Sequence, residues 1–399
     1  MTPAVTGRPF RIVLLSAAIA VLLGLGFLMH RNYFYQIAWY VLVLAPAAFV
    51  VRVPYLVALL RSWIVLFTLL YAAVFAVGVL WSPDPTLDWM FGQGWKCLSL
   101  ALFMAIAATA FARDGGMEAR FATFYVPAAA VGGLFAIVRH LADTPIDRLS
   151  GVGQLLPTII VGQAFAIASL IATMAAWKWV KQPYLRIACL ICALVCAFVV
   201  LLTQSRGPLL ALGMAIAVLA LAMPGKRGLR ILLMLAGGVC VVGLLFVFAN
   251  WQSLLERSDN YRFEIWRTYL QMALERPWLG YGVGDVPVEI GTGQMFEHTH
   301  NAFLTAQIHG GITALIAITG LFAASAWVAW RRYRDHQDPF AGALLVCVFV
   351  ASQFDRFNLV SNAGWQWLTF WFPFAILAAY ELRLRDPGTR AAGGERRND

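Results

Sequence analysis

Long apolar segments alternate with short polar links along most of the 399-residue chain. A transmembrane helix needs about 20 consecutive apolar residues to cross a hydrocarbon core about 30 Å thick. About twelve segments reach or approach that length: residues 10–29, 37–51, 62–81, 97–112, 121–139, 158–177, 187–203, 208–223, 229–249, 303–330, 340–354 and 365–382. The 303–330 segment is longer than one crossing requires, so we expect it to bend or to extend beyond the bilayer. The pattern predicts an all-α polytopic membrane protein.

The composition supports this fold class. Hydrophobic residues make up 61% of the chain, charged residues make up 13%, and the mean hydropathy is +0.73. These values lie far from those of soluble proteins. No small-residue cleavage site follows the first apolar segment, so we interpret it as a retained span rather than a signal peptide.

The basic residues indicate the orientation of the spans. With a cytoplasmic amino terminus, the cytoplasmic segments hold 20 of the 30 Lys and Arg residues, as the positive-inside rule requires, and both termini are cytoplasmic. The net charge of +10 therefore reflects topology, and no basic stripe suited to nucleic acid is present in the sequence. The six cysteines fall within or at the edge of spans, where we interpret them as small core residues.

One link differs in kind from the others. About fifty outward-facing residues, 250–302, separate the first nine predicted spans (residues 1–249) from the last three (residues 303–382), and loops of this length are usually functional. Residues 383–399 have the composition of a disordered cytoplasmic tail.

Within this link, residues 258–275 have the spacing of an amphipathic helix lying against the membrane surface or the bundle. Its apolar face is predicted to contain Tyr261, Ile265, Trp266, Tyr269, Leu270 and Ala273. Arg262 and Trp266 share one face, and Arg267 lies beside it. Snorkelling of arginine and tryptophan at a membrane interface is an equally ordinary explanation of this pattern.

A second outward-facing arginine lies in the segment TQSRGPLLAL. Arg206 occupies a very short link between two apolar spans, and an arginine at membrane depth costs about 2.5–3.5 kcal/mol, so it is a candidate functional residue. The alternative is that the short link exposes Arg206 to lipid headgroups. Pro208 suits the first turn of the helix that follows.

Three of the six histidines lie in the segment FEHTHNAFLTAQIHGG. His298 and His300 lack an H-E-x-x-H pattern and nearby cysteines, so we expect no metal site. His300 precedes an apolar helix that Asn301 or Thr299 can cap. The positive end of that helix disfavours imidazolium, so His300 can accept a proton. We interpret His309 as a core residue.

These groups favour transfer from an anionic lipid-linked donor on the outward side of the membrane. Arginine forks at Arg206, Arg262 and Arg267 could bind a diphosphate and stabilise its charge as it leaves. The sequence contains no P-loop, hydrolase triad or dinucleotide-binding fingerprint. We therefore expect no cofactor.

Three motifs in this order resemble the signatures of the O-antigen ligase family: TQSRGPLLAL, YRFEIWRTYLQMALERPWLGYGVG and HTHNAFLTAQIHGG. Its superfamily also includes O-antigen polymerases and bacterial O-oligosaccharyltransferases. An Arg-x-x-x-Leu element matches at Arg206 and Leu210, and a His-Asn element followed by Gly matches at His300, Asn301 and Gly311. Ala314 departs from the final position of the second element.

The resemblance implies a metal-independent, inverting glycosyltransferase of the bacterial inner membrane with a periplasmic active site. It would transfer O-antigen polysaccharide from undecaprenyl diphosphate to a sugar hydroxyl of lipid A–core, with His300 as the general base. Trp266 is a candidate for lining the lipid or sugar path, and Asn301 and His298 are candidate supporting residues.

Three alternatives remain open at this point. A polymerase would use a second lipid-linked glycan as acceptor, and an oligosaccharyltransferase would use a protein hydroxyl. A lipid-linked sugar transporter would carry charged residues or broken helices in several spans, whereas the predicted spans are nearly free of charge. The sequence therefore favours an enzyme.

Overall fold

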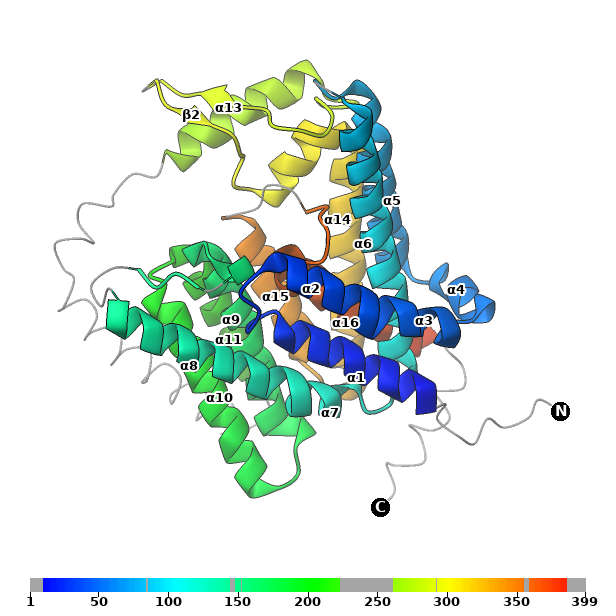
Figure 1. The fold of residues 1–399 in the computed structure, drawn as a ribbon, viewed down its shortest axis with the longest axis vertical. Helices are drawn as coiled ribbons and strands as arrows, with labels where there is room; N and C mark the ends of the chain where they lie inside the picture. The colour runs from blue at the N-terminus through cyan, green and yellow to red at the C-terminus, as the bar shows by residue number, and fades with distance from the viewer. Residues whose placement is uncertain are drawn as a thin grey trace.

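The computed structural model describes residues 10–83, 85–143, 148–151, 153–222, 261–291, 293–354 and 359–385. Within these residues the chain forms a helical bundle with one two-stranded sheet (Figure 1), so the predicted all-α class is confirmed. The bundle begins with α1 (Phe10–Leu25), α2 (Asn32–Ala38), η1 (Trp39–Leu44), α3 (Ala45–Val50), α4 (Val53–Leu59), α5 (Trp63–Gly78), η2 (Val79–Trp81) and α6 (Leu87–Arg113). It continues with α7 (Met117–Arg120), η3 (Phe121–Tyr125), α8 (Val126–Asp143), η4 (Gly153–Leu155), α9 (Thr158–Met174), η5 (Ala175–Trp179), α10 (Pro183–Leu202) and α11 (Arg206–Ala222). The remaining elements are α13 (Arg262–Glu275), β1 (Val288–Glu289), β2 (Met295–Phe296), α14 (Ala302–His336), α15 (Phe340–Ser352), η6 (Trp367–Trp371) and α16 (Phe372–Arg385).

The predicted spans agree with the described helices wherever they can be compared. Residues 229–249 lie outside the described residues, as does the predicted tail beyond residue 385, and every other predicted span overlaps a described helix. Within the described residues, seven helical stretches are long and apolar enough to cross a membrane, and α1, α11 and α15 are shorter apolar helices. The chain is therefore a multi-pass membrane protein.

Helix α16 and the π-helical turn η6 before it lie in the middle of the bundle. Every residue of η6 is buried, and so are most residues of α16. The Trp367 ring stacks on Phe103 of α6 with 4.4 Å between ring centroids, and it meets Trp39 of η1 edge-on at 4.9 Å. Large aromatic side chains thus join elements that are far apart in sequence.

A buried carboxylate fixes one end of α16 against the start of α5. Glu381 accepts hydrogen bonds from the Ser62 hydroxyl at 2.7 Å and from the backbone N–H groups of Trp63 and Ile64 at 3.1 Å each. Arg385 pairs with the same carboxylate at 2.7 Å. The positive end of α5 and one arginine therefore compensate the burial of this charge.

The long helix α14 bends at Gly311, which is one of the two outcomes expected from its length. Gly311 has φ 61° and ψ −156°, a conformation used almost only by glycine. The turn after α13 forms hydrogen bonds with two backbone groups of α14 beside the bend. Tyr281 donates its N–H to the Ile308 carbonyl at 2.7 Å, and the Pro277 carbonyl accepts the Ile312 N–H at 2.8 Å. The bend and the turn therefore form one unit.

The described part of the long link lies as a cap over one end of the bundle (Figure 1). Helix α13 packs against α14, and β1 pairs antiparallel with β2, with Val288 opposite Phe296. The predicted amphipathic helix is present, with Ile265, Tyr269 and Ala273 buried. Leu270 was expected on the same face but is 53% exposed, because the contact with the bundle covers only a narrow stripe of the helix.

We expect Gly311→Ala to destabilise the protein strongly. A Cβ at this position would lie 2.2 Å from the Trp278 carbonyl oxygen, and this backbone conformation costs a non-glycine residue about 1–3 kcal/mol even without a clash. Thermal unfolding of the purified variant should show a Tm several degrees lower. Gly213→Ala in α11 is the matched control, because its Cβ would meet nothing within 4 Å. Equal Tm values for the two variants would contradict this prediction.

Candidate functional site

The candidate base His300 lies in a constrained link between the hairpin and α14. Its backbone is left-handed, with φ 52°. The next residue, Asn301, is the N-cap of α14, and its side-chain oxygen accepts from the N–H groups of Phe303 at 2.9 Å and Leu304 at 3.1 Å. The preceding Thr299 accepts the Asn301 N–H at 3.2 Å. The capping predicted from the sequence is confirmed, and it holds His300 between two residues with fixed backbone.

Helix α13 contributes two side chains to the surroundings of this link. The Trp266 indole N–H donates to the Thr299 carbonyl at 2.9 Å. The Arg262 guanidinium lies over the Phe354 ring, 5.6 Å from its centroid. Both residues were predicted to share one face of the helix, and both point toward the segments around His300. Trp266 thus positions the backbone next to His300.

The end of α15 is where the three sequence motifs meet. Asn301 donates its side-chain N–H to the Gln353 side-chain oxygen at 3.1 Å. The neighbouring Phe354 lies under Arg262, and its Cβ is 2.8 Å from the point where Gly207 would carry a Cβ. Arg206, the exposed first residue of α11, directly precedes Gly207. We use the term motif junction for Gln353 and Phe354 together with the starts of α11, α13 and α14.

Each motif helix at this junction is preceded by a left-handed, non-glycine residue. The φ angles are 51° at Gln204, 51° at Tyr261 and 52° at His300. The fourth such residue among the described ones, Gln337, has the ordinary role of ending a helix. Strained backbone of this kind persists only where the surroundings enforce it, and it concentrates at functional sites.

The structure adds an arginine that the sequence analysis did not select. Arg148 donates to the Thr203 carbonyl at 3.0 Å and to the Ser205 hydroxyl at 2.7 Å, so it stabilises the turn that presents Arg206. No sequence signal could have found it, because it lies in a different polar link far from the motif. Arg148 is a positioning residue for Arg206.

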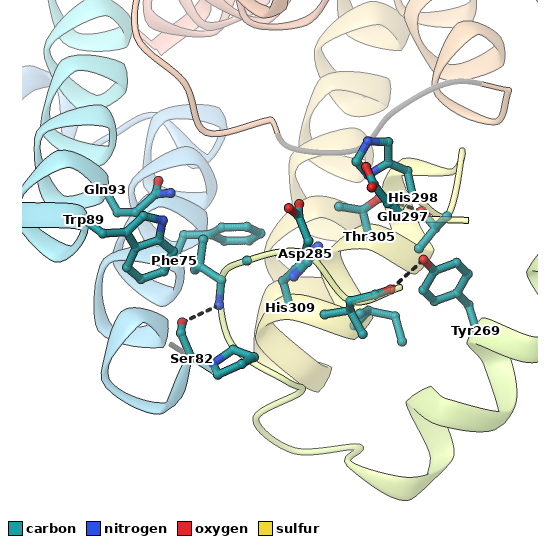
Figure 2. Close-up of a pocket in the computed structure, with 16 residues that line it drawn as sticks. Phe75, Ser82, Trp89, Gln93, Tyr269, Asp285, Glu297, His298, Thr305 and His309 are labelled. Carbon is teal, nitrogen blue, oxygen red and sulfur yellow. Dashed lines mark hydrogen bonds between the residues drawn. The ribbon is translucent and has the colours of Figure 1, made fainter. Parts of the chain in front are cut away.

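A cavity of about 340 Å³ adjoins the His300 link. Trp89 and Gln93 of α6 line one side, Glu297 and His298 line another, and Asp285 points into the space between them (Figure 2). His309 lies beside Asp285 and has its Nδ1 2.9 Å from the Gly282 carbonyl. His309 therefore has the structural contact expected of it, and it also lines the cavity.

The charges of the cavity differ from those of the motif junction. Its lining includes the carboxyl groups of Asp285 and Glu297 and no Lys or Arg among the described residues. Burial, and then the nearby Glu297 and Asp285, raise the pKa of the Tyr269 hydroxyl, which stays protonated and donates to the Val286 carbonyl at 2.8 Å. Such a cavity disfavours a diphosphate and suits an uncharged polyol, because carboxylates accept hydroxyl hydrogen bonds and an indole face packs on a sugar ring.

The other candidate residues lie at different places. The His298 ring is 6.4 Å from the His300 ring between centroids, and it belongs to the cavity lining. Arg267 lies on an exposed part of α13, and no contact joins it to Phe354 or to the His300 link in the described part of the chain. Within the described residues, no group of three His, Cys, Asp or Glu side chains could hold a metal ion.

Comparisons with known proteins agree with the three motifs. A family model described as O-antigen ligase matches residues 191–319, which contain Arg206, Arg262 and His300. A protein of Pseudomonas aeruginosa described as an O-antigen ligase is 25% identical over 378 residues, covering 93% of this chain and 91% of the relative. The region matched by the family model contains the starts of α11, α13 and α14, and the similarity to the relative extends over nearly all of both chains. The chain is therefore similar to the O-antigen ligase family in the region of the three motifs, and to one described O-antigen ligase over nearly its whole length.

Proposed function

We propose that this protein is an O-antigen ligase that transfers a polysaccharide from undecaprenyl diphosphate to a sugar hydroxyl of lipid A–core. The proposal places the reaction on the periplasmic side of a bacterial inner membrane, as an inverting transfer without a metal ion. The observation that carries it is the motif junction, where α11 starting at Arg206, α13 starting at Arg262 and α14 starting just after His300 meet at Phe354 and Gln353.

The arginines suit the leaving group. When the bond between the anomeric carbon and the diphosphate oxygen breaks, negative charge develops on the diphosphate, and planar guanidinium groups can bind it through paired hydrogen bonds. Arg206 and Arg262 are the proposed binding groups, and Arg148 orients the turn that carries Arg206. Arg267 is a further candidate that would have to reach the diphosphate from an exposed position.

His300 suits the attacking hydroxyl. A sugar hydroxyl attacks the anomeric carbon from the face opposite the diphosphate, and its proton passes to the neutral imidazole of His300. The glycosyl group moves to the acceptor oxygen with inversion, and undecaprenyl diphosphate leaves. The position of His300 supports this role, because its link separates a basic junction from an acidic cavity that suits sugars.

We propose that the cavity binds the acceptor sugars. Asp285→Asn should raise the KM for the acceptor about tenfold or more, because hydrogen bonds to a charged group contribute about 1.5–3 kcal/mol, while kcat should change less. Steady-state kinetics with varied acceptor would measure both constants. Glu289→Gln is the matched control, since Glu289 lies on β1 in the same link with an exposed side chain that does not line the cavity. An unchanged acceptor KM for Asp285→Asn would show that the cavity does not bind the acceptor.

The proposed function can be tested with purified protein, lipid-linked glycan and three acceptors offered separately. The acceptors are lipid A–core, a second lipid-linked glycan and a serine- and threonine-containing peptide, each with and without EDTA. Glycosylation of lipid A–core that survives EDTA is the expected result. Modification of the second glycan would indicate a polymerase, and modification of the peptide an oligosaccharyltransferase. Movement of the donor across a vesicle membrane without transfer to any acceptor would indicate a transporter.

A further inference from the structure

Two adjoining cavities at the other end of the bundle are lined by arginines. One has a volume of about 270 Å³ and lies between α4, the end of α6 and the end of α16. The other has a volume of about 460 Å³ and is lined in part by Trp327 and Arg331 of α14. Arg61 and Arg385 line both cavities. Together we call them the arginine pocket.

The arginine pocket lies far from the motif junction and the acidic cavity. Helix α5 starts two residues after Arg61, and beyond its other end Ser82 accepts the Val283 N–H at 2.9 Å at the edge of the acidic cavity. Helix α14 begins directly after the His300 link and carries Arg331 near its other end. Figure 1 shows α4 and α13 at different levels of the bundle. The pocket is thus on the side that the sequence assigns to the cytoplasm.

The side chains that line the arginine pocket carry a net positive charge. Five arginines line it, Arg61, Arg113, Arg331, Arg383 and Arg385, and no Asp or Glu does so among the described residues. Arg385 pairs with the buried Glu381, Arg383 donates to backbone carbonyls and to Glu118, and Arg331 pairs with Asp335. These three arginines are therefore held by the protein.

Arg61 and Arg113 provide the uncompensated charge. Both side chains are exposed, and neither forms an ion pair with a described carboxylate. The Arg113 guanidinium lies over the Tyr55 ring, 3.9 Å from its centroid, which orients the group without neutralising it. Two cations beside a cavity, one of them oriented by an aromatic ring, are suited to an anion.

Apolar side chains surround these cations. On and after α4, Val53, Val57 and Leu60 are exposed, and so are Trp63 and Trp327. Tryptophan and arginine together are typical of the membrane interface, where the ring lies at headgroup level. Basic pockets between transmembrane helices on the cytoplasmic side bind anionic headgroups. A free phosphate would use the cations and leave this apolar surface uncovered.

We propose that the arginine pocket binds the phosphodiester headgroup of an anionic phospholipid from the cytoplasmic leaflet. Arg61 and Arg113 contact the phosphate, and the exposed side chains of α4 contact the acyl chains. The site uses none of the residues assigned to transfer, so it is independent of the proposed function. Bound lipid would link α4, α6, α14 and α16 at this end of the bundle.

The test uses the full-length protein, delipidated in neutral detergent and titrated with phosphatidylglycerol, phosphatidylethanolamine or inorganic phosphate. Native mass spectrometry measures the bound lipid, and the Tm measures its stabilising effect. We expect wild type to bind phosphatidylglycerol in preference to phosphatidylethanolamine. Since each basic group near an anionic lipid strengthens binding about fivefold, the double variant Arg61→Gln, Arg113→Gln should lose affinity on the order of 20-fold.

Arg186→Gln is the matched control, because Arg186 is another exposed arginine, on α10, and lines neither cavity. It should bind phosphatidylglycerol as wild type does. Equal affinity of the double variant and wild type would overturn the proposal, and so would equal binding of the two lipids by wild type. Stabilisation by inorganic phosphate as strong as that by phosphatidylglycerol, lost in the double variant, would replace the lipid with a soluble anion.

Discussion

His300→Ala is expected to lower the rate of glycan transfer by about 10²–10⁴-fold, the usual contribution of a positioned general base. The sugar hydroxyl is a poor nucleophile while it keeps its proton, and alanine cannot accept that proton. Binding of the lipid-linked donor should be nearly unchanged, because the proposed diphosphate contacts come from α11 and α13. The measurement is single-turnover transfer with saturating donor, alongside donor binding and the Tm of each variant.

The backbone at His300 requires a second variant. Alanine is disfavoured at φ 52°, so a loss of activity in His300→Ala could arise from a shifted link. Asparagine adopts left-handed backbone more readily than most residues but cannot act as a base near neutral pH. His300→Asn should therefore keep the wild-type Tm and still lose transfer. Near wild-type transfer in His300→Asn would exclude the base role.

The other two histidines of the segment serve as comparisons. His298 lines the acidic cavity, so His298→Ala should act mainly on the acceptor KM. His309 contacts the Gly282 carbonyl, so His309→Ala should act partly through stability. Both variants should retain more activity than His300→Asn. A larger loss of transfer at His298, with the Tm unchanged, would move the base to that residue.

Arg206→Lys and Arg262→Lys are each expected to reduce transfer by about 10²–10³-fold, as for other groups that bind charge developing in the transition state. Lysine keeps the charge and snorkels equally well, but it offers a point charge in place of a planar fork. At Arg262 the substitution also removes the planar group that lies over Phe354. Transfer is measured at equal amounts of protein in the membrane. Arg267→Lys should have a smaller effect, because Arg267 is exposed and away from Phe354.

Arg276→Lys is the matched control for Arg262→Lys. Arg276 belongs to the same link, and its guanidinium lies over the Tyr281 ring, 4.8 Å from the centroid, but it lies at the opposite end of α13 from Arg262. Its replacement should leave transfer close to wild type. Full activity in both Arg206→Lys and Arg262→Lys would return these arginines to an interfacial role and leave the diphosphate without an assigned site.

Local patterns in the sequence accounted for much of the fold. Membrane spans are predictable because each must satisfy its own backbone hydrogen bonds and present apolar side chains along its whole length. The cap at Asn301 and the helix before Pro277 follow from residues only a few positions apart. The order of the motifs around Arg206, Arg262 and His300 likewise indicated the resemblance to the O-antigen ligase family, because a motif is itself a local pattern.

The contacts between these segments were decided only by the tertiary structure. The contacts of Phe354 with Gly207 and Arg262, the support of Arg206 by Arg148, and the acidic cavity around Asp285 all join residues from distant parts of the chain. Nothing in the local sequence of α6 marks Trp89 and Gln93 as cavity residues, because a side chain on an apolar helix has the same pattern whichever neighbour it meets. The sequence by itself determined the helices and the chemical groups at their ends. Helix packing determined which groups share a site, because packing depends on the shapes of several helices at once.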